Sequence, residues 1–144
     1  MDVKKELTKE YLYERVDHYI ENEILPKLTE FVNIPSLSRN FDTEFFTNGL
    51  CEQTNKLYLD WFKHMDLKGV SHAEIYEEKG KTPLLFCIIE ASDPSITSNI
   101  LLYGHNDKQP HLFNDWSEGL HPFKTVRKGD KMYGRGISDD GYAF

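Results

Sequence analysis

The sequence predicts an α/β domain in which helices pack on a mixed central sheet. Two segments repeat apolar residues every three or four positions, which is typical of one face of a helix. A later segment, Leu84–Ile89, is apolar at every position, as in a strand covered on both faces. Glycine-containing turn signals separate several shorter strand-like pieces. With 144 residues, 39% of them hydrophobic, the chain fits one domain with its own core.

Two helices are expected in the first half of the chain. The first spans residues 8–32, and its apolar positions fall on one face: Leu12, Val16, Tyr19, Ile20, Ile24, Leu28 and Phe31. Pro26 has no backbone donor, so it should kink this helix or split it in two. The second helix spans residues 44–65, with a core-facing stripe of Phe46, Leu50, Thr54, Leu57, Trp61 and Met65. Gly69 follows it as a stop signal.

Three strands are expected after the helices, over residues 73–78, Leu84–Ile89 and residues 100–103. The connection between the second and third strands is too short for a helical crossover, so these two should be antiparallel neighbours. A further hairpin is expected over residues 123–133, with its turn at Gly129-Asp130. Cys51 and Cys87 lie in apolar segments without ligand-like spacing, which favours buried free thiols over a disulfide.

The charge of the chain excludes some classes of partner. The formal net charge is -7 and the basic residues are dispersed, whereas binding to phosphate groups needs clustered Lys and Arg. No apolar segment follows the charged start of the chain as in a secretory signal, and no apolar run approaches the length of a membrane span. We therefore expect a soluble cytoplasmic protein that binds neither nucleic acid nor membrane.

The most informative stretch begins where the third expected strand ends. In an extended segment, residues i and i+2 point to the same side, which places His105 and Asp107 together. His105 can then present one ring nitrogen to a metal ion while Asp107 accepts the N–H of the other, which fixes the tautomer. After the glycine-flanked Arg135, Asp139 or Asp140 would supply an anionic oxygen that suits zinc or manganese.

These residues belong to a longer series of separated motifs. Its members are Gly104, His105, Asp107, Gln109, Pro110, Trp116, Pro122, Phe123, Tyr133, Gly134, Arg135, Gly136, Asp139 and Asp140. In this order they resemble the catalytic domain of the dinuclear-zinc peptidases and deacylases, the family of carnosinase, aminoacylase, acetylornithine deacetylase and glutamate carboxypeptidase. The resemblance extends upstream to Leu25-Pro26, residues 31–36, Phe41-Asp42 and Gly49, and so covers nearly the whole chain.

The resemblance implies a phosphorylase/hydrolase-like zinc exopeptidase fold, of which residues 1–144 would be the N-terminal portion without the lid or dimerisation domain. It implies two divalent metal ions in the complete enzyme: zinc first, with manganese or cobalt also suited. His105 would bind one ion, Asp139 would bridge both, and Asp107 would be the catalytic residue that orients His105. The peptide bond between Asp139 and Asp140 is expected to be cis, as is frequent in the family.

The implied reaction is metal-assisted hydrolysis of a peptide or an N-acyl amino acid, with a homodimer as one option for the complete enzyme. In the family, the general base and the remaining ligands come later in the sequence than Phe144. The chain alone is therefore expected to bind zinc weakly and to be inactive. The family also commonly has Asp-Asp-Lys-Gly where this chain has Asp-Asp-Gly-Tyr, and an apolar residue in place of Lys108.

Several roles stay open at this point. Arg135 is expected to pair with a carboxylate rather than to contact substrate, and Trp116 and Phe123 to pack a loop onto the sheet. His111 and His121 are interpreted as surface histidines rather than as spare metal ligands. The acidic residue at position 140 either supports the site or opens a helix over residues 139–144.

Two other functions also remain possible. The first is a non-catalytic α/β interaction module that binds a protein partner through exposed apolar surface. The second is an unrelated α/β binding module, in which His105 and Asp107 form only a hydrogen bond within a loop.

Overall fold

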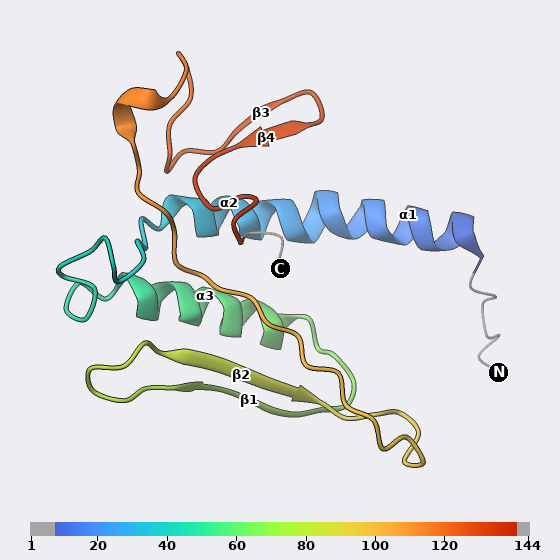
Figure 1. Cartoon of the computed structure of the whole chain (residues 1–144). Coiled ribbons are helices and arrows are strands. Elements are labelled where there is room, and N and C mark those ends of the chain that lie inside the picture. Colours follow the sequence, from blue (N-terminus) through green and yellow to red (C-terminus); the bar gives the residue numbers. More distant parts are fainter. Residues whose placement is uncertain (1–7, 141–144) are drawn as a thin grey trace.

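Two helical segments and two separate antiparallel hairpins make up the part of the chain that the computed structural model describes, residues 8–140. The elements in chain order are α1 (Lys9–Tyr19), the π-helical η1 (Ile20–Ile24), α2 (Leu25–Asn33), α3 (Leu50–His64), β1 (Val70–Tyr76), β2 (Leu84–Ile89), the 3-10 helix η2 (Phe113–Asp115), β3 (Val126–Lys128) and β4 (Lys131–Tyr133). Figure 1 shows them in layers, with α3 between the α1–α2 rod and the β1–β2 hairpin, and with the β3–β4 hairpin beyond the rod.

The first helix runs through Pro26 without breaking, but its hydrogen-bond pattern changes before the proline. The Leu25 N–H donates to the carbonyl of Ile20, five residues earlier, as in a π-helix. Pro26 follows directly, and because it has no N–H it cannot donate to a carbonyl of the preceding turn, so the regular α-helical pattern is interrupted here. The kink or split that the sequence predicts therefore appears as a π-helical insertion within one rod.

The hydrophobic core lies at the C-terminal end of this rod. Phe31 and Val32 are 0% exposed and, with Leu28, they form its centre. The side chains that pack around them come from both helices, from β4 and from the turn after it: Leu25, Leu57, Tyr58, Met132 and Ile137. The apolar face that the sequence predicts along the first helix is not buried over α1, which contains no buried residue. Helix α2 is therefore the element on which the other segments meet.

The second helix begins at Leu50 and not at residue 44 as predicted. The preceding residues form turns, in which the carboxylate of Asp42 accepts from the Glu44 N–H at 2.9 Å and from the Asn48 side chain at 2.7 Å. Gly49 then has a φ of +73°, a left-handed conformation that an α-helix does not contain. Local side-chain hydrogen bonds thus replace the first turns of the expected helix.

The prediction of a mixed central sheet is wrong for the described residues. Strand β1 pairs antiparallel with β2, strand β3 pairs antiparallel with β4, and the two hairpins form separate sheets. The bounds of β2 are as predicted, but it is covered on one face only. Leu85 and Cys87 are half-buried and Leu84, Phe86 and Ile88 are exposed, so the outer face of the hairpin carries unburied apolar side chains.

Residues 100–103 do not form the predicted third strand, and the expected antiparallel pairing with β2 is wrong because the sheet that contains β2 has only β1 as its other strand among the described residues. The side chains of Ile100, Leu101 and Leu102 are each 87% exposed, and that of Tyr103 is 85% exposed. A strand that is apolar at every position needs neighbours on both edges and cover on both faces. None of the described residues pairs with this segment.

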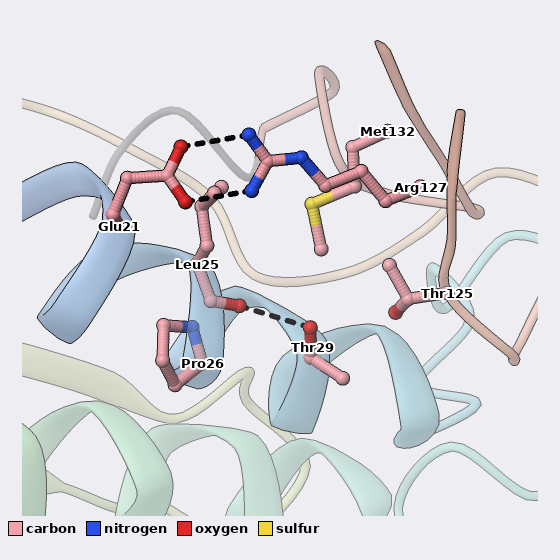
Figure 2. A pocket seen from close by; sticks show the side chains of 7 residues that line it. All are labelled: Glu21, Leu25, Pro26, Thr29, Thr125, Arg127 and Met132. Atoms are coloured by element: carbon pink, nitrogen blue, oxygen red, sulfur yellow. Dashed lines mark hydrogen bonds and ion pairs between the residues drawn. The ribbon is translucent and has the colours of Figure 1, made fainter. Parts of the chain in front are cut away.

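The hairpin expected over residues 123–133 is confirmed, with Lys128 paired to Lys131 across the Gly129-Asp130 turn. This hairpin is attached to the first helix by an ion pair at the rim of a shallow pocket, which Figure 2 shows from close by. The carboxylate of Glu21 accepts two hydrogen bonds from the Arg127 guanidinium, at 2.6 and 2.7 Å. These bonds lower the pKa of Glu21.

Both cysteines are free thiols, as predicted, although Cys87 is only half-buried whereas Cys51 is buried. No helix within residues 8–140 combines the length and the apolar composition needed to cross a membrane.

We expect Phe31→Ala to lower the free energy of unfolding by about 3–5 kcal/mol, because a fully buried ring is removed from the centre of the core. Leu101→Ala is the control, since its side chain is 87% exposed. It should change stability by no more than about 0.5 kcal/mol. Urea unfolding followed by circular dichroism measures both, and a large loss for Leu101→Ala would show that residues 100–103 are packed after all.

Candidate functional site

The loop that carries His105, residues 104–108, is anchored to two parts of the N-terminal half. The Ser36 hydroxyl donates to the Asn106 carbonyl at 3.1 Å, and the Lys108 N–H donates to the Ser36 carbonyl at 2.8 Å. On the other side, the Asn106 side chain donates to Asn55 Oδ1 at 2.7 Å. Asn55 is 2% exposed and belongs to α3. The loop is therefore fixed to α3 and to the residues that follow α2.

A second turn, Gly134-Arg135-Gly136, brings the acidic pair toward the same place. A Cβ atom at Gly134 would lie 2.7 Å from Val32 Cγ1, and a Cβ atom at Gly136 would lie 2.9 Å from Lys108 Cε. Gly136 also has a φ of +92°, which side chains rarely adopt. Only glycine at both positions lets this turn approach α2 closely enough to place Asp139 beside His105.

The structure brings together all three residues that the sequence predicts for the site. The Nε2 atom of His105 lies 3.1 Å from Asp139 Oδ1, and its Nδ1 atom lies 2.9 Å from Asp107 Oδ1. Asp140, whose role the sequence leaves open, is 5% exposed and its Oδ2 accepts from the His105 backbone N–H at 3.1 Å. Three carboxylates thus contact His105, two of them at the ring nitrogens and the third at the backbone N–H.

The carboxylates around His105 stabilise the charged form of its imidazole relative to the neutral form. Burial lowers the pKa of His105, but the charge and the hydrogen bond of Asp107 raise it, as do the charges of Asp139 and Asp140, and the net pKa is above the ordinary value. A protonated imidazole donates from both nitrogens. A metal ion at Nε2 would displace one of these protons, so metal binding should release a proton.

The donor atoms fit part of a zinc site. Two ligand atoms about 2.0–2.1 Å from one tetrahedral zinc ion lie roughly 3.3 Å apart. The separation of His105 Nε2 and Asp139 Oδ1 is 3.1 Å. Because a catalytic zinc has three protein ligands, this pair would supply two of them. Within residues 8–140, no group of three or more His, Cys, Asp or Glu residues is arranged to hold a metal ion.

Arg135, Trp116 and the histidines at positions 111 and 121 make contacts outside this site. The guanidinium of Arg135 lies over the Trp116 ring, 5.5 Å from its centre, and the Trp116 indole donates to the His111 carbonyl at 2.8 Å. The predicted ion pair of Arg135 with a carboxylate is not formed with any described residue. His111 and His121 contact phenylalanine rings, with centres 4.7 Å apart for His111–Phe123 and 6.2 Å apart for His121–Phe123.

The peptide bond between Asp139 and Asp140 is cis, as expected. The helix predicted from residue 139 onward falls largely on residues 141–144, which lie outside the described part of the chain. Nothing in the sequence pattern marks Asn55 for a site role, because it lies outside the apolar stripe of its helix. The sequence signal for a role of Asp140 is its position next to Asp139. The signal for Lys108 is a charged residue where the resembling family commonly has an apolar one.

A comparison with models of known protein families finds no match to this sequence. A comparison with curated proteins finds no significant match.

We expect Asp107→Asn to lower the pKa of His105, because the substitution removes the charge that raises it most. A raised histidine pKa stabilises the folded chain below the unfolded value of 6.5, and this contribution is lost as the pH rises through the folded pKa. The variant should therefore lose stability below pH 6.5. NMR titration of the imidazole measures the pKa, with Asp17→Asn on α1 as the control, and an unchanged pKa in Asp107→Asn would contradict the observed geometry.

Gly136→Ala should destabilise the chain more than Gly80→Ala does. Both glycines have positive φ, +92° and +78°, so both variants pay for the backbone conformation. Only Gly136 adds a clash, at 2.9 Å from Lys108 Cε, whereas a Cβ at Gly80 meets nothing within 4 Å. The clash should add about 1–3 kcal/mol, measured as the difference between the two variants in thermal unfolding. Equal losses would mean that the turn does not approach Lys108.

Proposed function

We propose that this chain forms the N-terminal portion of the catalytic domain of a dinuclear metal-dependent hydrolase that cleaves peptide or N-acyl amide bonds. The observation that carries the proposal is the position of the His105 ring, with Asp139 at Nε2 and Asp107 at Nδ1, at 3.1 and 2.9 Å. The two turns that meet here are the ones whose motifs resemble the zinc peptidases and deacylases. The domain assignment rests on that resemblance.

Each residue has a distinct task in this proposal. His105 and Asp139 would hold the metal, which when bound would supply Lewis acidity and a water of lowered pKa. Asp107 keeps the proton on Nδ1, so that Nε2 is left with its lone pair toward the metal. Asp140 fixes the backbone of His105 through the N–H. The Asp139 side chain is 60% exposed, which leaves its second oxygen accessible to a further ion.

A second candidate function is favoured by a separate observation. The apolar residues 100–103 are 85–87% exposed, and the outer face of β2 exposes Leu84, Phe86 and Ile88. Exposed apolar surface of this kind is typical of a protein interface, and a chain can be bound by adding a strand to a free strand edge. This arrangement suits the non-catalytic interaction module, whose partner would be a protein.

The hydrolase proposal predicts that the chain binds zinc or cobalt through His105. His105→Ala should weaken the affinity at least tenfold in a calorimetric titration at pH 7.5, while His64→Ala, an exposed histidine at the end of α3, should leave it unchanged. The chain alone should not hydrolyse a dipeptide or an N-acyl amino acid. Equal zinc affinity in the wild type and in His105→Ala would refute the proposal. Metal-dependent turnover by the chain would refute the expectation that its active site is incomplete.

The interaction module makes a different prediction for the same proteins. With a chelator present, size-exclusion chromatography with light scattering should show a defined oligomer of the chain. This oligomer should persist in His105→Ala and be lost in Leu101→Lys. A monomer in all three cases would count against this candidate and leave the metal measurement as the deciding one.

A further inference from the structure

We infer that Lys108 is a positioning residue, which holds the turn carrying His105 and Asp107 in place against Asp139. The inference deepens the proposed function and rests on it. Lys108 is the position at which the sequence departs from the apolar residue that is common in the family it resembles. Its contacts in the structure give a physical reason for a charged residue there.

The ammonium group of Lys108 uses all three of its donors inside the protein. The side chain is 1% exposed. Its Nζ donates to the carbonyls of Phe31 and Ile34, at 2.9 and 2.7 Å, and to the Ser36 hydroxyl at 3.2 Å. A buried ammonium without such partners would be strongly unfavourable. The three acceptors surround the point where α2 ends, so Lys108 closes the C-terminus of that helix.

Two further interactions favour a cation at this point. The last carbonyls of a helix carry partial negative charge, which stabilises a cation placed beside them. The Lys108 Nζ also lies 3.6 Å from the centre of the Phe31 ring, within the range of a cation–π interaction. A lysine at position 108 is thus attached to the most deeply buried part of the core.

The same side chain touches the other half of the site. The Cε atom of Lys108 lies so close to Gly136 that a Cβ there would be 2.9 Å away. Lys108 is also the covalent neighbour of Asp107, which holds His105 Nδ1. One residue therefore joins the end of α2, the turn that carries the imidazole and the turn that leads to Asp139. Loss of its hydrogen bonds should let the two turns shift apart.

This role does not depend on which protonation state Lys108 adopts. Burial lowers the pKa of Lys108 to about 7, while the charge of Asp107 raises it. The neutral amine still has two N–H donors for the carbonyls of Phe31 and Ile34. The attachment of the turn is therefore retained on both sides of neutral pH.

Lys108→Met tests the inference, because methionine fills the same space and binds none of the three acceptors. We expect the downfield NMR signal of the His105 Nδ1 proton, a marker of its hydrogen bond to Asp107, to broaden or disappear at pH 6. Cobalt affinity at pH 7.5, read from the visible spectrum of the bound ion, should fall at least tenfold. Ser36→Ala removes one acceptor and the bond to Asn106, so it should cause a smaller loss in the same direction.

Two controls separate positioning from general stability. Leu28→Ala removes core volume from α2 without touching the turn, and Lys63→Met removes an exposed lysine from α3. Both should keep the His105 signal and the cobalt affinity at a temperature where each variant is folded by circular dichroism. Equal loss in Leu28→Ala, or a folded Lys108→Met with both readouts unchanged, would overturn the inference. If Lys108→Met does not fold, Ser36→Ala is measured instead. A folded Ser36→Ala with both readouts unchanged would then overturn the inference.

The proton signal also separates this inference from the proposed function. If the wild-type chain binds no cobalt but Lys108→Met alone loses the His105 signal, the metal proposal fails and the positioning of the turn by Lys108 stands. If cobalt binds through His105 and Lys108→Met keeps both readouts, the proposed function stands and the role of Lys108 is refuted.

Discussion

The contact on which this structure depends is the one between the His105 imidazole and its carboxylates. Asp107 reaches one ring nitrogen from the same turn, whereas Asp139 reaches the other from a turn 34 residues further along. A local turn alone can produce the first contact. The second requires that two segments distant in the sequence be held side by side, and the fold achieves this through α2.

Helix α2 serves as the common support. Its residues Phe31 and Val32 are fully buried. They pack against α3 and against the Gly134-Arg135-Gly136 turn. Its C-terminal carbonyls receive the Lys108 ammonium. Phe31 and Val32 therefore belong both to the core and to the contacts that position the site. By contrast, α1 at the N-terminal end of the rod contains no buried residue.

Local signals in the sequence were sufficient for several features. The turn signal at Gly129-Asp130 predicted the hairpin, the apolar run predicted the bounds of β2, and the His-x-Asp spacing predicted the contact of Asp107 with His105. Features that depend on distant partners were not predictable in this way. Residues 100–103 have strand composition, but a strand forms only where another edge accepts it. The buried roles of Asn55 and Lys108 arise from contacts that no spacing rule reveals.

The central claim is that the imidazole of His105 and the carboxylate of Asp139 take up one cation together. X-ray absorption at the zinc edge, recorded on the chain loaded with one equivalent of zinc, tests it most directly. The account predicts nitrogen and oxygen ligands about 2.0–2.1 Å from the metal, including one imidazole whose signal is absent in His105→Ala. A shell with a sulfur ligand near 2.3 Å from either free cysteine, or one identical in wild type and variant, would contradict it.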